Sequence, residues 1–272
     1  MQARHLILMI TSTRWLVVLL LAFSFSPAQG QTRSKGAAGG GMGGAPVPGA
    51  LQFNAAMTKL FGDHRAFTTV MEVEVKQGSA AENISMPTKL SFLEGKSRIE
   101  IDLSRAKGPQ IPPGAAEQLK AMGMSDMTMI SREDKQVAYL VYPGLQSYAE
   151  MKSEEGANDA AKIKVSTSEI GRESIDGHVC VKNKVTVTDA NGKATDATVW
   201  NATDLKQFPL RIETAEGKDK VTMKFKDVKF EKPAATLFDP PASFTRYDSV
   251  QTMMQEAMMK KLLGGAGGKP GK

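Results

Sequence analysis

Cys180 and His178 are the residues whose types and spacing most suggest chemistry. Cys180 is the only cysteine of the 272 residues, and His178 lies two positions before it. A nucleophilic thiol needs an imidazole within hydrogen-bond reach and a third group that orients the imidazole. On a strand the two side chains would share one face, with Cα atoms roughly 6–7 Å apart. No acidic or amide residue is obviously placed as the third group. We therefore interpret Cys180 as an unpaired structural thiol on the more polar face of a strand, with an intermolecular disulfide or a redox role as the alternative.

The sequence gives little support for a metal site or a phosphate-binding loop. Of the other two histidines, His5 lies in the predicted signal and His64 before the first expected strand. The two histidines that remain, with one cysteine, do not make a closed zinc site. The 16 methionines are dense at 122–129 and 253–259. Thioethers can hold Cu(I), but they also give an adaptable apolar surface for packing or for varied hydrophobic ligands, which is the interpretation we favour. The glycine-rich tail lacks a phosphate-loop pattern. We predict no metal and no cofactor.

Carboxylates give no catalytic pair. Glu72, Glu74, Glu100 and Asp102 alternate along expected strands, which is typical of the solvated face of a sheet. Nothing in their spacing selects two of them as the acid and base of a glycosidase. We predict that the protein is not an enzyme, and a hydrolase stays as the least favoured alternative.

The first thirty residues have the pattern of a cleaved secretory signal. Arg4 and Arg14 make the start basic, and an apolar run follows. Small residues precede two candidate cleavage points, after Gly30 or after Ala28. The run is short for a transmembrane helix of about 20 residues, and an uncleaved anchor would contain Arg14. No cysteine lies near the cleavage point. We therefore predict an exported, periplasmic protein without a lipid anchor.

Two segments rich in glycine frame the remaining chain. Residues 31–50 are expected to form a flexible linker and residues 264–272 a disordered tail, because neither has enough apolar side chains to offset the entropy of ordering. Residues 51–263 then form a single domain with its own core. Loss of residues 1–30, with two arginines and no acids, lowers the formal charge from +6 to +4. This mildly basic balance does not indicate a nucleic-acid binder.

Alternation of apolar and polar residues dominates the domain. We predict ten or eleven antiparallel strands in one continuous meander, one of them running from His178 to Thr188. A sheet of this size is expected to curl and to present a concave face. A shift in apolar parity after Lys226–Asp227 indicates a bulge. Hairpin turns are expected at Glu94-Gly95, Asp176-Gly177 and Asn191-Gly192.

Helices are expected at the two ends of the domain. A short helix is predicted at 51–61, and another within 108–124 over the edge of the sheet. Residues 248–263 predict an amphipathic helix, capped by Asp248 or Ser249, that covers the concave face. Its apolar side is expected to carry Val250, Met253, Met254, Ala257, Met258 and Leu262.

Four segments, in this order, carry a resemblance to a known family. Residues 129–151 fit R-x-D…P-x-x-x-x-Y, and residues 172–185 fit G-x-x-C-x-K. Residues 199–213 fit W-x-A-x-D-L…P, and residues 237–249 fit L-F-x-x-P-x-x-[FY]. The pattern resembles the exported family called domain of unknown function 4412, over roughly residues 60–248.

That family is similar in architecture to the LolA/LolB-like lipoprotein-carrier superfamily of Gram-negative bacteria. The resemblance implies a mainly β (α+β) fold, a large curled antiparallel sheet or half-barrel with helices at the ends packing on the concave face. It also implies an apolar cavity for acyl chains. For the carriers' lipoprotein-binding arginine, Arg98, Arg132 and Arg211 are candidates by strand position.

The sequence thus predicts an exported, non-enzymatic protein that binds a hydrophobic small molecule, a lipid or a lipoprotein acyl chain in a half-barrel. An envelope protein is a further candidate partner, nucleic acid is not expected, and contact with a membrane is expected to be transient or peripheral. The alternative is a structural or interaction module of the cell envelope without a ligand. The residues predicted to line the site are Phe67, Met71, Val73, Phe92, Ile101, Tyr139, Trp200, Phe225, Met254 and Met258.

Overall fold

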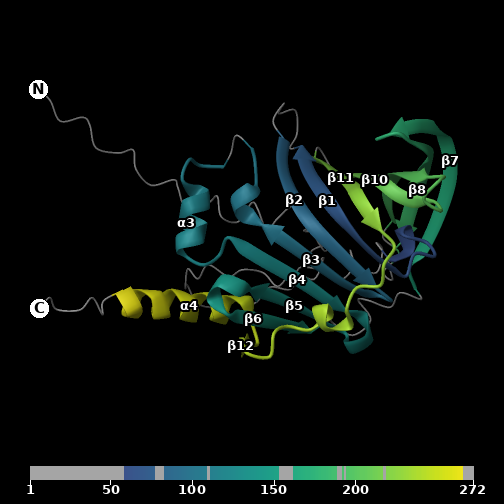
Figure 1. The fold of residues 1–272 in the computed structure, drawn as a ribbon. Helices are drawn as coiled ribbons and strands as arrows, with labels where there is room; N and C mark the ends of the chain where they lie inside the picture. The colour runs from purple at the N-terminus through teal and green to yellow at the C-terminus, as the bar shows by residue number, and fades with distance from the viewer. Residues whose placement is uncertain are drawn as a thin grey trace, which may run out of the picture.

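A computed structural model describes residues 58–76, 83–108, 111–152, 162–188, 192, 194–216 and 219–265 (Figure 1). The predicted signal at 1–30, the predicted linker at 31–50 and most of the helix expected at 51–61 lie outside these residues. So does most of the predicted tail, since helix α4 ends at Gly265. The described chain forms one twelve-stranded sheet with short helices.

The sheet consists of two meanders and one added edge strand. The first meander comprises β1 (Ala66–Lys76), β2 (Asn83–Leu93), β3 (Lys96–Asp102), β4 (Asp126–Arg132), β5 (Val137–Tyr142) and β6 (Ser147–Lys152). The second comprises β7 (Lys164–Ile175), β8 (His178–Thr188), β9 (Ala194–Ala202), β10 (Phe208–Glu216) and β11 (Asp219–Lys229), and β12 (Thr245–Tyr247) follows. The spatial order is β12-β6-β5-β4-β3-β2-β1-β11-β10-β9-β8-β7.

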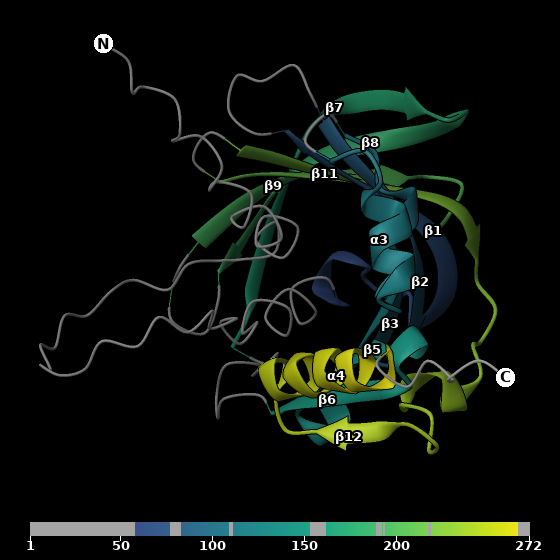
Figure 2. The same cartoon turned by 90° about the vertical axis from the view of Figure 1, so that its left-hand side faces the viewer.

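The predicted single meander is wrong, because β6 and β7 lie in opposite halves of the sheet and the two meanders meet where β1 pairs with β11. Neighbouring strands are antiparallel except β12, which is parallel to β6. Figure 2 shows the sheet bent into an open trough, with α4 lying along the inner side of β6. The edge strands β7 and β12 do not pair with each other, so the trough is not closed into a barrel. The predicted fold class, a large curled and mainly antiparallel sheet, is confirmed.

Local turn signals gave correct hairpins. Glu94 and Gly95 have φ values of 49° and 81°, and Asp176 and Gly177 have φ values of 49° and 86°. Positive φ at both central residues is the geometry of the type I′ turn, whose twist matches that of paired strands. β8 and β9 also pair as a hairpin, while Asn191 of their predicted turn lies outside the described residues.

The predicted bulge in β11 is confirmed. Thr68 pairs with Lys229, whereas Val70 pairs with Lys226, so β11 contains one residue more than β1 over this stretch. Asp227 lies in the bulge with a φ of 51°. The extra residue explains why the apolar parity of the sequence shifts after this point.

The helices are short except for α4. They are η1 (Leu103–Arg105), α3 (Ala115–Ala121), η2 (Glu133–Lys135), η3 (Pro143–Leu145), η4 (Ala235–Phe238) and α4 (Val250–Gly265). α3 packs on η1, and α4 packs on β6 and β12. Ser249 caps α4, since its Oγ accepts a hydrogen bond from the backbone N–H of Thr252 at 3.0 Å.

Two groups of buried apolar residues form the core. The larger one, the concave cluster, has buried members from β12 at one edge through to β8, together with Phe61 and Met253. The smaller one, the outer cluster, consists of Leu93, Ile130, Val137, Tyr139, Val141 and Phe238. On β5, members of the outer cluster alternate with Leu140 and Tyr142 of the concave cluster, so the two clusters lie on opposite faces of the sheet.

Candidate ligand-binding site

The concave cluster gathers most of the residues that the sequence predicted for ligand binding. Met254 of α4 is partly buried against it. The predicted residues that are buried members of the cluster are Phe67, Met71, Val73, Phe92, Ile101, Trp200 and Phe225. Strands β1, β2, β3 and β11 supply six of these seven side chains, so most of the predicted residues gather at the centre of the trough.

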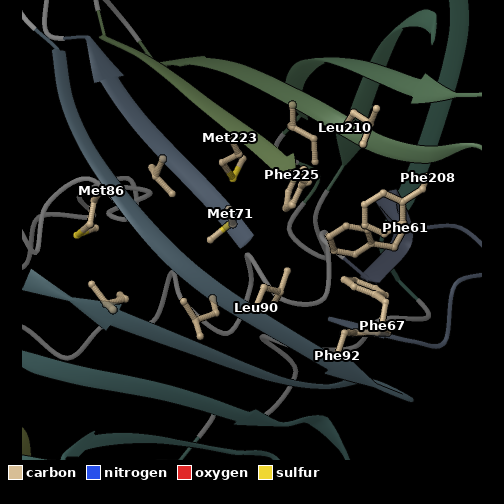
Figure 3. Packing of buried hydrophobic residues seen from close by; sticks show 14 of the residues in the cluster. Phe61, Phe67, Met71, Met86, Leu90, Phe92, Phe208, Leu210, Met223 and Phe225 are labelled. Atoms are coloured by element: carbon tan, nitrogen blue, oxygen red, sulfur yellow. The ribbon is translucent and has the colours of Figure 1, made fainter. Parts of the chain in front are cut away.

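Phenylalanines fill one end of the concave cluster (Figure 3). Phe61, which precedes β1, is 2% exposed. Its ring centroid lies 4.7 Å from that of Phe67, 5.4 Å from that of Phe208 and 5.6 Å from that of Phe225. Phe92 is also near, at 6.1 Å. Aromatic pairs at such distances attract each other beyond the burial of their area. Phe61 therefore lies among four strand-borne rings without belonging to the sheet.

Methionines fill the other part of the cluster. Figure 3 shows Met71, Met86 and Met223 on the other side of the cluster from Phe61, Phe67, Phe92 and Phe208. The buried methionines of the cluster are Met71, Met86, Met127, Met223 and Met253, and Met124, Met129, Met151 and Met254 pack against it. Methionine side chains are unbranched and flexible, so they adapt to ligands of different shapes. The methionine segment at 122–129 thus contributes to the apolar face.

The prediction that Tyr139 lines the site is wrong, because this side chain lies on the outer face of the sheet. Tyr139 lies in the outer cluster with its ring centroid 5.9 Å from that of Tyr148. All six residues of β5 are buried, so this strand shows no alternation that would distinguish its faces. The neighbouring residues Leu140 and Tyr142 point into the concave cluster instead. Met258 lies in α4, but its side chain is outside the described part of the structure.

Trp200 belongs to the concave cluster, but two cations cover its indole ring. Lys182 Nζ lies 5.0 Å and Arg211 Cζ 4.6 Å from the ring centroid. The indole Nε1 donates a hydrogen bond to Glu173 Oε2 at 2.7 Å. Arg211 also forms an ion pair with Glu213. These contacts leave little of the ring for an acyl chain, and they assign Arg211 a packing role.

Arg98 and Arg132 hold a segment on the outer face. Arg98 Nη1 donates to the carbonyl of Leu237 at 3.1 Å, and Arg132 Nη1 donates to that of Phe238 at 3.3 Å. Phe238 is fully buried in the outer cluster. Both arginines thus fasten η4 to the back of the sheet, away from the concave cluster. The described contacts of the three candidate arginines do not involve the phenylalanines or methionines of the concave cluster.

Cys180 is a buried residue, which corrects its predicted position on a polar face. The thiol is free, fully buried and in contact with the concave cluster. Sγ donates to the backbone carbonyl of His178 at 3.6 Å, and burial raises the pKa of the thiol. His178 does have an acidic partner, because Nδ1 lies 2.7 Å from Asp204 Oδ2. An elevated thiol pKa opposes nucleophilic reactivity at neutral pH, so the structural interpretation of Cys180 is the better one.

The described residues contain no group of three or more histidine, cysteine, aspartate or glutamate side chains that could hold a metal ion. Within the same residues, no helix is long and apolar enough to cross a membrane.

No protein-family model matches the chain, and no curated protein matches it in sequence. Membership of the family named domain of unknown function 4412 therefore stays a prediction. Among solved structures, a LolA superfamily protein from Nitrosomonas europaea aligns with 70% of this chain and 96% of its own, at 10% identity and a TM-score of 0.34. Lipoprotein LppX of Mycobacterium tuberculosis covers 66% of this chain and 94% of its own, at 12% identity and a TM-score of 0.34. LprF from Mycobacterium bovis covers 74% of this chain and 100% of its own, at 14% identity and a TM-score of 0.36. At these low values, function has to be argued from the residues of this chain.

Proposed function

We propose that this protein is an exported, non-enzymatic binder of a hydrophobic molecule, a lipid or a lipoprotein acyl chain, on the concave side of its sheet. The observation that carries the proposal is the extent of the concave cluster, which has buried members on β8–β12 and β1–β6. Among the described side chains, the fully buried ones that reach this cluster from outside the strands are Phe61 and Met253. A wide apolar face of this kind is suited to a hydrophobic ligand.

The chemistry of the cluster favours an acyl chain over a polar ligand. Its buried members are aliphatic, aromatic or sulfur-containing, and the buried charge at Arg132 is held on the outer side with Phe238. A chain of methylenes gains free energy from such a surface in proportion to the area removed from water. The methionines allow chains of different length or saturation to fit.

Phe61 occupies the place that a ligand would take. Burying one phenylalanine contributes about 1.5–3 kcal/mol, and burying one methylene contributes about 0.8 kcal/mol. An acyl chain that places about four methylenes among Phe67, Phe208 and Phe225 therefore offsets the loss of the Phe61 ring. The proposal is that the segment around Phe61 and the ligand compete for one site.

Two alanine variants test this competition. Phe61→Ala removes the ring from the concave cluster, and Phe238→Ala removes an equally buried ring from the outer cluster. Each is expected to cost about 3–5 kcal/mol in the free energy of unfolding, and leucine variants serve if an alanine variant does not fold. A fluorescent fatty acid, dansyl-undecanoic acid, is titrated against both. We expect Phe61→Ala to bind more tightly than the unmodified protein, and Phe238→Ala to bind as the unmodified protein does.

Native mass spectrometry after purification from the cell envelope, with lipid extraction, tests the natural ligand. Acyl-containing species are expected, and the N-terminus of the recovered protein should be Gln29 or Gln31 if the signal is cleaved as predicted. Two results together would overturn the proposal. One is that no acyl-containing species is recovered under conditions that retain such species on a known carrier, and the other is that Phe61→Ala binds the probe as the unmodified protein does. That result would favour the second candidate, an envelope module without a ligand, which the tight packing of Phe61 among four rings also supports.

A further inference from the structure

Ser131 of β4 carries a buried hydroxyl group without a partner. The residue is 3% exposed, and its Oγ has no hydrogen-bond partner among the described residues. A buried hydroxyl that makes no hydrogen bond lowers the stability of the folded state, so it needs an explanation. A hydroxyl can donate one hydrogen bond and accept two. Ser131 is therefore able to bind a polar group of a ligand.

Ser131 lies on the concave face of the sheet. Its neighbour Ile130 belongs to the outer cluster. Its other neighbour, Arg132, donates to the carbonyl of Phe238 on the outer side. Because side chains alternate along a strand, Ser131 points to the opposite face, which is the face of the proposed ligand site.

A row of paired residues connects Ser131 with the phenylalanine end of the trough. Ser97 of β3 lies directly opposite Ser131, and Phe92 of β2 lies directly opposite Ser97. Directly opposite side chains have Cβ atoms roughly 4.5–5.5 Å apart. Phe92 belongs to the concave cluster, and its ring centroid lies 6.1 Å from that of Phe61. Both serines thus lie near the place where we propose that a ligand replaces Phe61.

Glu133 adds a carboxyl group at the same end of the strands. It follows Ser131 by two positions, and its Oε2 lies 2.9 Å from the position that a Cβ on Gly95 would take. Its Oε1 accepts a hydrogen bond from Thr58 at 3.3 Å. Burial raises the pKa of Glu133, so this environment opposes negative charge. We call Ser97, Ser131 and Glu133 the polar corner.

The segment that contacts Glu133 also carries Phe61. Thr58 precedes Phe61 by three positions and lies in the same short helical segment. Movement of Phe61 out of the concave cluster would therefore also withdraw the Thr58 hydroxyl from Glu133. Lys59, whose charge attracts the Glu133 carboxylate, lies on this segment too. A ligand that replaces the segment would meet phenylalanine rings along its chain and the polar corner at its head.

We propose that the polar corner binds the uncharged, hydroxyl-bearing head of a monoacyl lipid such as a monoacylglycerol, while the acyl chain lies along the concave cluster. Ser131 Oγ donates to an oxygen of the head, and Glu133 accepts from a head hydroxyl in place of Thr58. A free fatty acid is disfavoured, because its carboxylate would lie beside Glu133, and the charge of Asp134 also acts on this site. This inference rests on the proposed function and specifies the class of ligand.

Isothermal titration calorimetry with monododecanoylglycerol and with dodecanoate tests the proposal. It is carried out at about pH 8, well above the ordinary pKa of a glutamate. We expect the unmodified protein to bind monododecanoylglycerol more tightly than dodecanoate. Ser131→Ala should weaken the binding of monododecanoylglycerol about fivefold. Ser91→Ala is the matched control, because Ser91 is equally buried but precedes Phe92 in β2 and so lies on the outer face, and it should bind as the unmodified protein does.

Glu133→Gln tests the role of the charge. Loss of the carboxylate should strengthen the binding of dodecanoate about fivefold. The glutamine carbonyl still accepts from a head hydroxyl, so the binding of monododecanoylglycerol should change less than about twofold. Glu100→Gln is the matched control, because Glu100 lies between Ile99 and Ile101 of the concave cluster and therefore on the outer face, and it should change the binding of neither lipid.

Urea unfolding separates a ligand-binding role of Ser131 from a structural one. Because the hydroxyl has no partner in the fold, Ser131→Ala should unfold at a urea concentration no lower than that of the unmodified protein. A lower concentration, unchanged binding of monododecanoylglycerol by Ser131→Ala, or dodecanoate binding that Glu133→Gln does not strengthen would each overturn the inference. Tighter lipid binding by Phe61→Ala without effects of the corner variants refutes the polar corner alone, whereas no effect of any of these variants contradicts the ligand site of the proposed function as well.

Discussion

Arg132 fastens the outer segment to the sheet by the geometry of its guanidinium group, and replacing it by lysine tests this. The Arg132 side chain is 9% exposed. Nε and Nη2 donate to the two carboxylate oxygens of Asp134 at 2.8 Å each, and Nη1 donates to Asp239 Oδ1 and to the carbonyl of Phe238. A lysine at this position keeps the charge but has a single nitrogen, so it cannot reproduce the forked pair of hydrogen bonds to Asp134.

The expected loss of stability follows from the exposure of the partners. Hydrogen bonds to charged groups contribute about 1.5–3 kcal/mol when both groups are buried, and exposed pairs about 0.2–1 kcal/mol. Asp134 and Asp239 are 43% and 47% exposed, so water replaces part of each hydrogen bond that the substitution breaks. Because a lysine can restore only one or two of the four hydrogen bonds, we expect Arg132→Lys to lower the free energy of unfolding by about 1–3 kcal/mol. If charge alone mattered, the loss would stay below about 0.5 kcal/mol.

Lys135→Ala is the matched control, because Lys135 Nζ lies 2.9 Å from the same Asp239 oxygen but is 48% exposed. Its removal is expected to cost less than about 0.5 kcal/mol. The measurement is urea unfolding followed by tryptophan fluorescence, with an unchanged m-value. The reasoning fails if Arg132→Lys unfolds at the urea concentration of the unmodified protein, or if Lys135→Ala costs as much as Arg132→Lys.

Two further predictions concern buried titratable groups. Burial raises the pKa of Tyr142 from 10.0 to about 12, so the folded state holds this proton longer than the unfolded state. The stability that comes from this difference is present below pH 10 and is lost as the pH rises toward 12, by about 2–3 kcal/mol. The free energy of unfolding, measured with urea between these pH values, should therefore depend less on pH in Tyr142→Phe than in the unmodified protein. Cys180→Ser should keep the fold and the binding of dansyl-undecanoic acid, at a cost of about 1–2 kcal/mol for placing a hydroxyl in a buried site. Native Cys180 should react with a thiol reagent only after unfolding, and loss of binding by a folded Cys180→Ser protein would contradict a structural role.

Local signals predicted the strands and turns well. The strand from His178 to Thr188 has the bounds of β8, and the Asp-Gly turn before it has the expected positive φ values. Turn chemistry and alternation act over a few residues, so a single sequence contains them. Gln136 and Gln146, with φ values of 53° and 49°, occupy the left-handed position that ends two turns, where glycine is the usual residue. Their side-chain types gave no signal for that conformation.

Properties that depend on distant partners were not predictable from the sequence. The burial of Tyr139 in the outer cluster requires Phe238, which follows it by 99 positions along the chain. Asp204, the partner of His178, comes from the turn after β9, where Thr203 also donates to the carbonyl of Val179. The same turn lies beside Cys180 and helps to explain why an apparently polar strand face is buried. Each of these interactions joins segments that no local pattern relates.

The order of the strands decides where the proposed binding site lies. In a single meander β1 would be an edge strand, and the residue before it would reach only the rim of the trough. Here β1 has six strands on one side and five on the other, because it pairs with β11 as well as with β2. Phe61 precedes β1 by five positions and therefore enters the middle of the concave face. A ligand that displaces Phe61 would occupy the centre of the trough, while the rim beside β6 stays covered by Met253 of α4.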